Sequence, residues 1–144
     1  YANWMINDDG TQTVVSMWQC KMLGVNGMLY WSCCYWDTSN LFGYGNLKTA
    51  PTGTIPVWGD GVLIYPGSPF GLDTAVSSLR LEGVRDGIED YEYLTMMEKL
   101  AGKEAMDEYI NLIATSVVTF TQDDDRIAAV RSMLGDKLEE PLNK

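Results

Sequence analysis

The side chains best suited to ligand recognition in this sequence are aromatic, and several of them gather around one apolar segment. Tyr30 and Trp31 lie inside the run Met28–Cys34, Trp36 follows it closely, and Tyr65 ends a later apolar stretch. An indole or phenol ring can offer an apolar face to a ligand while its polar edge makes a hydrogen bond. The alternative for each ring is an ordinary core or loop-anchoring residue, because buried aromatic side chains are common.

Acid–base chemistry would need carboxylates, and these concentrate between residues 82 and 92. The helical spacing of Glu82, Arg85 and Glu89 places them beside one another on one helix surface, which favours ion pairs. We also expect Arg80 to neutralise part of this cluster. Surface ion pairs are commonplace, so we interpret the cluster as structural. Its members are Glu82, Asp86, Glu89, Asp90 and Glu92.

Other common catalytic and metal-binding patterns are missing from the sequence. It has no histidine, which removes serine–histidine and cysteine–histidine catalysis and the usual zinc sites from this chain. Cys33 and Cys34 are adjacent, so they would leave a strand on opposite faces, and we expect them in the core. Asp123-Asp124-Asp125 lacks the spacing of a calcium loop and suits a helix start instead. We expect neither a metal site nor a cofactor.

Composition excludes several broad classes of protein. The formal net charge is −10 and no long basic stretch occurs, so nucleic acid and anionic membranes are poor candidate partners. A hydrophobic content of 46% excludes a disordered chain. No apolar run reaches the roughly eighteen residues of a membrane span. The opening Tyr1–Met5 carries no signal peptide and suggests a segment of a longer protein, so no cellular compartment follows.

Hydrophobic periodicity predicts the elements that must position the aromatic rings. A short strand over residues 1–6 carries Asn3 near its end, and a helix follows over 11–23, closed by Gly24. The continuous apolar run 28–34 suits a strand that is buried on both sides. Strand, helix and buried strand in this order form a βαβ unit.

The rest of the sequence divides into a long connection and a helical region. Residues 35–72 are rich in Gly, Pro, Asn and Thr and contain a predicted hairpin over 57–65. Asp60-Gly61 supplies the residues that a tight primed turn prefers, so we expect Asp60 to be structural. Three helices are predicted after the connection, over residues 77–100, 104–119 and 123–138.

Three stretches of the sequence together resemble one known family. They are Gly27–Trp31 with Trp36 shortly after, then Trp58–Gly67, and then Ser78–Leu94. In this order and spacing they resemble the C-terminal end of glycoside hydrolase family 123. The resemblance covers roughly residues 1–100, and the helical motif 78–94 is its most specific part.

The resemblance implies an α/β fold, namely the C-terminal portion of a (β/α)8 TIM-type barrel. Residues 1–102 would supply the last two βα units, with the loop and hairpin at 35–72, and residues 103–144 a helical extension packed on the barrel. A whole barrel takes about 250 residues, so its missing N-terminal part is an expected partner. Gly83 and Gly87 each destabilise a helix by about 1 kcal/mol, which suggests that this helix closely approaches the barrel strands.

The resemblance also implies a retaining, substrate-assisted enzyme acting on β-linked N-acetylhexosamine, with N-acetylgalactosamine the expected sugar. Such enzymes use an adjacent Asp–Glu pair, and nothing here matches it. We therefore expect that pair upstream and no catalytic residue in this chain. Barrel enzymes place their sites at the carboxyl ends of the strands. The expected substrate-binding residues are Trp31, Trp36, Tyr30, Tyr65 and Asn3.

Two other functions stay open at this point. One is a non-catalytic carbohydrate-binding or scaffold domain of the same barrel family, which an upstream Asp–Glu pair would argue against. The other is a helical interaction domain that docks a partner through residues 103–144. Thr11-Gln12-Thr13 replaces charged residues that family members tend to carry, which leaves the sugar specificity open. As a free chain, unpaired barrel strands would be expected to aggregate or to pair with another molecule.

Overall fold

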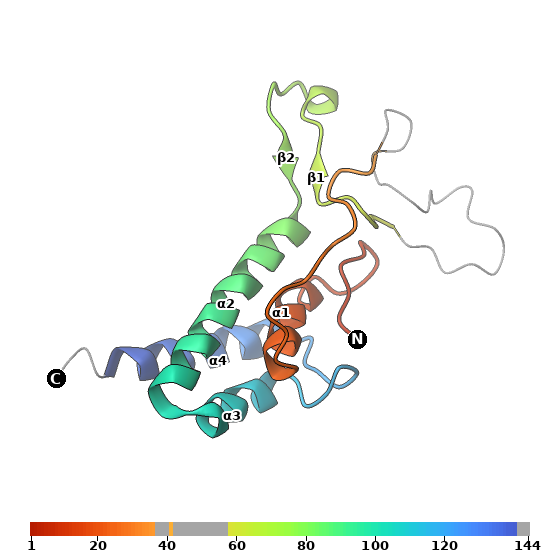
Figure 1. Cartoon of the computed structure of the whole chain (residues 1–144). Coiled ribbons are helices and arrows are strands. Elements are labelled where there is room, and N and C mark those ends of the chain that lie inside the picture. Colours follow the sequence, from red (N-terminus) through yellow and green to blue (C-terminus); the bar gives the residue numbers. More distant parts are fainter. Residues whose placement is uncertain (37–40, 42–57, 141–144) are drawn as a thin grey trace.

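The structure of the chain is a computed structural model, which describes residues 1–36, 41 and 58–140. Its elements are α1 (Gln12–Met22), β1 (Ile64–Tyr65), the 3₁₀ helix η1 (Ser68–Phe70), β2 (Val76–Ser77), α2 (Leu79–Ala101), α3 (Lys103–Ile113) and α4 (Asp124–Glu139). The helices pack together, and the antiparallel pair β1–β2 projects from the N-terminal end of α2 (Figure 1). This mixture is compatible with part of an α/β domain. None of these helices combines the length and the apolar character that crossing a membrane requires.

Local capping signals set the end of α1 and the starts of α2 and α4 close to where the sequence predicts them. At the end of α1, Gly24 adopts a φ of +67°, and the amide of Val25 donates to the carbonyl of Cys20 at 2.9 Å. This is the glycine-dependent termination expected there. Ser78 and Asp123 cap α2 and α4, because each side chain accepts a hydrogen bond from a backbone amide three residues later.

The third helix is shorter than the sequence predicts. It ends at Ile113 instead of near residue 119. Ala114 pairs with Phe120 in an isolated antiparallel bridge, and the amide of Thr121 donates to the carbonyl of Ile113 at 2.8 Å. This local backbone pairing takes the place of the last helical turns.

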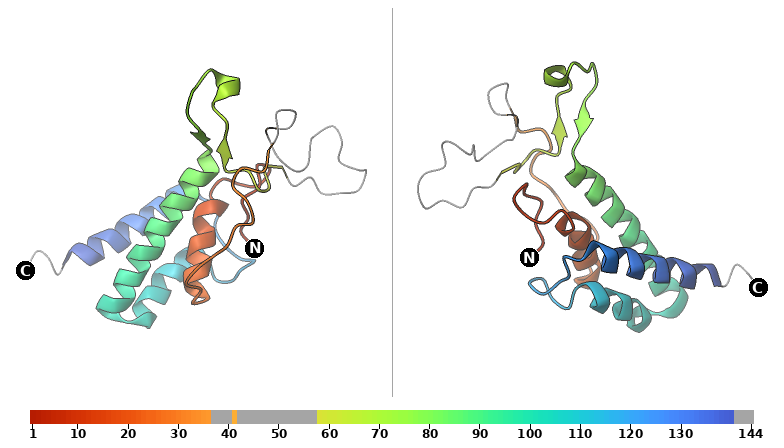
Figure 2. Two further views of the ribbon diagram at one scale, coloured as in Figure 1. Left: turned by 45° about the horizontal axis from the view of Figure 1, so that its top comes forward. Right: turned by 180° about the vertical axis from the view of Figure 1, so that it is seen from behind.

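The main core lies where the helices meet. Trp18 of α1, Leu94 of α2 and Leu134 of α4 are completely buried, and burying one such side chain contributes about 1.5–3 kcal/mol. α4 crosses the α1–α2 pair on one side, as the view from behind shows (Figure 2). The buried members of this core are Val15, Trp18, Leu94, Met97, Met106, Ile110, Ile113, Ile127, Val130 and Leu134.

Helices α1 and α2 approach each other closely at two glycines of α2. A Cβ atom on Gly83 would lie 2.1 Å from Oγ1 of Thr13, and one on Gly87 would lie 2.8 Å from the carbonyl oxygen of Val14. The two glycines predict a close approach here, with barrel strands as the expected neighbour. The close approach is confirmed, but the neighbour in this chain is helix α1.

Replacing Gly87 with alanine is expected to lower the free energy of unfolding by up to about 2 kcal/mol. Alanine favours a helix over glycine by about 1 kcal/mol, but overpacking against the backbone of α1 opposes this by about 1–3 kcal/mol. Gly135 of α4 provides the matched control, because no atom lies within 4 Å of a Cβ built there. Gly135→Ala should therefore raise the melting temperature while Gly87→Ala lowers it, and equal shifts in the same direction would contradict the assigned contact.

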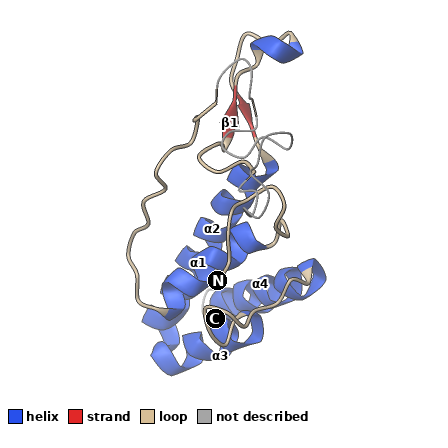
Figure 3. Cartoon of the chain, turned by 90° about the vertical axis from the view of Figure 1, so that its right-hand side faces the viewer, coloured by secondary structure: helices blue, strands red, loops and turns tan. Residues whose placement is uncertain are grey.

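The two strands of the predicted βαβ unit do not form within the described residues. Residues 1–5 and 25–33 are neither helix nor strand, and the second segment runs as a long loop from the end of α1 toward β1 (Figure 3). Leu29 is 88% exposed, so the expected burial on both sides is also wrong for this chain. Cys34, expected in the core, is exposed. A strand requires a neighbouring strand, and among the described residues Cys34 has a single bridge partner, Val62.

The predicted hairpin over 57–65 is also wrong in the part that the structure describes. Ile64 pairs with Ser77 and Tyr65 with Val76, so the partner of this strand lies after η1. Around Asp60 the chain makes a compact turn in which the amide of Val62 donates to the carbonyl of Gly59 at 3.0 Å. The turn residues favour a tight turn as predicted, but the chain leaving that turn pairs with a later segment.

Candidate functional site

Asp60 brings two of the expected site residues together. Its Oδ1 accepts a hydrogen bond from Nε1 of Trp31 at 2.8 Å and one from the hydroxyl of Tyr30 at 3.3 Å. The Tyr30 hydroxyl also accepts from the amide of Gly61 at 2.9 Å. Burial is the main cause of the raised pKa of Tyr30. The turn around Asp60 therefore fixes the polar edges of both rings.

Trp31 is held firmly and yet remains open to ligand. Gly61 has a φ of +71°, and a Cβ atom there would lie 2.4 Å from Cζ2 of the indole, so only glycine lets the ring lie this close. The ring centroids of Trp31 and Tyr35 are 4.9 Å apart with a tilt of 58°. After these contacts the side chain is still 51% exposed. An immobilised, half-exposed indole is the main surface feature of the cluster.

Arg80 joins the same region from the first turn of α2 and is buried. Its guanidinium donates to the carbonyl of Trp4 at 2.7 Å, to that of Gly59 at 2.8 Å, and to that of Val62. It also donates to the hydroxyl of Tyr65 at 3.2 Å. The expectation that Arg80 neutralises acids on its own helix is wrong. A cation is unfavourable at a helix N-terminus, and this signal could have indicated a specific partner elsewhere.

The remaining expected site residues differ in how close they come to the cluster. Nε1 of Trp36 donates to the carbonyl of Ile64 at 3.0 Å, which holds Trp36 beside the β1 strand. Asn3 contacts the cluster only through its neighbour: its Oδ1 accepts from the amide of Trp4 at 2.8 Å, and the Trp4 ring lies 4.8 Å from that of Tyr30. The structure thus brings Tyr30, Trp31 and Trp36 against the segment 59–65, which includes Tyr65. Asn3 lies at the edge of this aromatic cluster.

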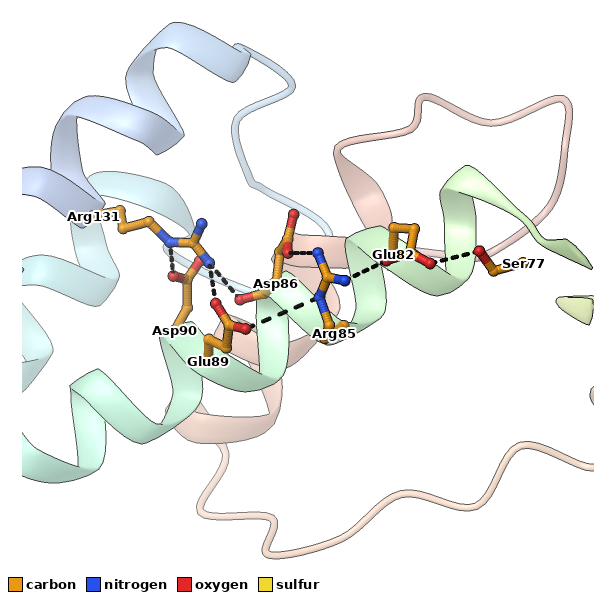
Figure 4. A network of polar contacts seen from close by, with 7 residues as sticks. All are labelled: Ser77, Glu82, Arg85, Asp86, Glu89, Asp90 and Arg131. Carbon is orange, nitrogen blue, oxygen red and sulfur yellow. Dashed lines mark hydrogen bonds and ion pairs between the residues drawn. The ribbon is translucent and has the colours of Figure 1, made fainter.

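The acidic cluster of α2 makes a separate polar network (Figure 4). Glu82 pairs with Arg85 at 2.5 Å and Arg85 with Glu89 at 4.0 Å, so both predicted ion pairs are present. Asp90 departs from the prediction of a surface residue, because it is completely buried. It accepts a hydrogen bond from Nε1 of Trp18 at 2.8 Å and pairs with Arg131 of α4. This network ties α1, α2 and α4 together away from the aromatic cluster.

The comparison with known protein families identifies the family of the chain. A family model described as the catalytic domain of glycoside hydrolase 123 matches residues 1–97. The match includes α1, the aromatic cluster, Arg80 and most of α2. The chain is therefore of the glycoside hydrolase class. The chain belongs to glycoside hydrolase family 123, as the sequence resemblance predicted. No curated protein sequence matches the chain significantly.

Proposed function

We propose that this chain is the C-terminal part of the catalytic barrel of a retaining enzyme that hydrolyses β-linked N-acetylhexosamine, with N-acetylgalactosamine as the first candidate. In the proposed mechanism the acetamido oxygen of the substrate attacks the anomeric carbon. An adjacent Asp–Glu pair upstream of this chain stabilises the acetamido group and protonates the leaving oxygen. This chain supplies an aromatic wall of the sugar site and no catalytic residue.

The immobilised indole of Trp31 is the observation that carries the proposal. A sugar ring presents an apolar C–H face that needs a flat apolar partner and polar groups at its rim. Trp31 offers such a face, because it is 51% exposed while Asp60, Gly61 and Tyr35 restrict its motion. Fixing the ring before binding removes much of the entropy that ordering a mobile side chain would cost.

The segment before Trp31 supports the assignment to a barrel. Between residues 26 and 32, no backbone group hydrogen-bonds to another described backbone group. Leu29 is highly exposed, and Val25–Met28 line an open pocket of about 300 Å³ together with Val84 and Ile88 of α2. An apolar segment with unpaired backbone groups invites pairing with further strands. We propose that these strands belong to the N-terminal part of the same barrel.

The activity is tested on the intact enzyme with an aryl β-N-acetylgalactosaminide. We expect hydrolysis with retention of anomeric configuration, as measured by NMR of the first-formed sugar. The 144-residue chain alone should not hydrolyse the substrate. Replacing the acetamide with a trifluoroacetamide should slow the reaction strongly, because the fluorines weaken the attacking carbonyl oxygen. Sugar binding without hydrolysis would favour the non-catalytic alternative, and inversion of configuration would contradict the proposed mechanism.

The Trp31→Ala variant of the intact enzyme is expected to lose about thirtyfold in kcat/KM, since a sugar covering roughly 80 Å² of the ring contributes about 2 kcal/mol. Its melting temperature should hardly change, because half of the side chain is already in water. Trp31→Phe keeps an aromatic face and should lose less activity. Unaltered kinetics together with a large drop in melting temperature would instead make Trp31 a structural residue.

A further inference from the structure

We propose that Asp60 is a sugar-binding residue, which holds Trp31 with one carboxylate oxygen and accepts hydroxyl groups of the substrate with the other. This inference rests on the proposed function and deepens it, because it adds a specificity-determining residue to the aromatic wall. The sequence predicts Asp60 as a turn residue, and the tight turn is present; its backbone conformation does not by itself call for an aspartate.

The turn does not require an aspartate at position 60. The two residues in the left-handed region are Gly59 and Gly61, with φ of +75° and +71°, and no described residue other than glycine has a positive φ. The turn is closed by the hydrogen bond from the Val62 amide to the Gly59 carbonyl. Arg80 holds the turn in place by donating hydrogen bonds to the carbonyls of Gly59 and Val62. Backbone conformation therefore leaves the choice of side chain at position 60 free.

The carboxylate of Asp60 has unused hydrogen-bonding capacity. An ionised carboxylate has about four acceptor sites on its two oxygens. Both hydrogen bonds to Asp60 reach Oδ1, one from Trp31 and one from Tyr30. Among the described residues, Oδ2 accepts no hydrogen bond, and no ion pair includes Asp60. Oδ2 is thus available as a charged acceptor.

The position of this acceptor fits a sugar that lies on Trp31. The bond from the indole Nε1 at 2.8 Å places the carboxylate at the rim of the ring. A pyranose stacked on the indole face carries its hydroxyl groups outward around its edge, toward such a rim. A hydroxyl donating to a carboxylate makes a charge-assisted hydrogen bond, which is stronger than a neutral one. The pair of Trp31 and Asp60 would therefore recognise both the apolar face and the hydroxyl pattern of the sugar.

The test uses Asp60→Asn in the intact enzyme, with an aryl β-N-acetylgalactosaminide and its 3-, 4- and 6-deoxy analogues as substrates. Asparagine keeps a carbonyl oxygen for Trp31 and Tyr30 but replaces the charged acceptor. We expect kcat/KM on the parent substrate to fall by about tenfold to a hundredfold. On the analogue that lacks the bound hydroxyl, the variant and the wild type should agree within about threefold. Asp136→Asn on α4 makes the same charge change at an exposed residue and controls for net charge.

Three results would overturn the inference. The first is a variant within about threefold of the wild type on the parent substrate, and the second is an equal loss on every analogue, which would leave Asp60 holding Trp31 alone. The third needs no variant: a wild type that hydrolyses all deoxy analogues as well as the parent. If the wild type hydrolyses neither the parent substrate nor any analogue, the proposed function fails. The role of Asp60 is then decided separately by titration with N-acetylgalactosamine, with tryptophan fluorescence as the readout. Equal affinities of wild type and variant, or no binding by either, would then reject its role.

Discussion

Arg80→Ala is expected to lower the free energy of unfolding by about 3–5 kcal/mol and to remove most of the activity of the intact enzyme. The guanidinium donates to the carbonyl of Trp4 near the N-terminus and to the carbonyls of Gly59 and Val62 in the turn around Asp60. Losing it leaves the carbonyls of Trp4 and Val62 without this donor in a region where Arg80 itself is buried, whereas the Gly59 carbonyl keeps the Val62 amide. An unsatisfied buried acceptor costs about 1–3 kcal/mol, and water entering the site would recover a part of the total.

The effect of Arg80 on activity should follow from the turn that it holds. The carbonyls of Gly59 and Val62 flank Asp60 and Gly61, which fix Trp31. Loosening the turn should therefore free the indole and lower kcat/KM even at temperatures well below unfolding. Steady-state anisotropy of tryptophan fluorescence would report this loosening in the folded variant. Full activity in a folded Arg80→Ala enzyme would contradict the link between this arginine and the site.

Arg85 of the same helix is the matched control for Arg80. Its side chain is 64% exposed and its ion pairs, with Glu82 at 2.5 Å and Asp86 at 3.1 Å, lie at the surface. Such pairs contribute about 0–1 kcal/mol. Arg85→Ala should therefore leave both the melting temperature and kcat/KM close to those of the wild type. The contrast separates the buried contacts of Arg80 from the general effect of removing an arginine from α2.

The helices were predictable because their signals are local. Apolar spacing, the caps Ser78 and Asp123, and Gly24 after α1 all act within a few residues. The strands depend on partners that are remote in sequence, so periodicity alone could not place them. Residues 28–34 have the composition of a buried strand, but among the described residues the chain provides a single bridge at Cys34. The wrong hairpin has the same origin, since the partner of Ile64 is Ser77.

The candidate site could be predicted only in part, for a related reason. The aromatic residues are recognisable by type, and four of them lie at or beside residues 59–65. Asp60 and Arg80 organise these rings. Asp60 bonds to Trp31, which lies 29 residues away in the sequence, and Arg80 bonds to Trp4, which lies 76 residues away. No local pattern encodes such pairings. The unfavourable position of a cation at the start of α2 was the one usable hint.

Asp90→Ala is expected to lower the free energy of unfolding by about 3–5 kcal/mol, because it leaves a buried polar network broken. Asp90 is completely buried and bridges Nε1 of Trp18 to Arg131, which also donates to the carbonyl of Asp86 at 2.6 Å (Figure 4). Asp86→Ala is the control, since that side chain is 39% exposed and pairs only at the surface. Thermal unfolding should show a large shift for Asp90→Ala and a small one for Asp86→Ala.

The pH dependence of stability gives a second test of Asp90, in which Asp90→Asn imitates the protonated carboxyl. Burial raises the pKa of Asp90 above its usual value despite hydrogen bonds from Arg131 and Trp18. A carboxyl with a raised pKa binds its proton more tightly in the folded state than in the unfolded state. Its contribution to stability is then full below the unfolded pKa of about 4 and is lost as the pH rises through the folded pKa.

The stability of the wild type relative to Asp90→Asn should therefore fall as the pH increases from about 4 upward. Urea unfolding of both proteins across this range measures the difference, and other carboxyl groups cancel because both proteins share them. A difference that grows with pH would show the opposite balance, in which the attraction of Arg131 outweighs the burial of the charge. The same measurement thus decides whether the ion pair between α2 and α4 stabilises the fold through its charge or through the hydrogen bonds that a neutral side chain can also make.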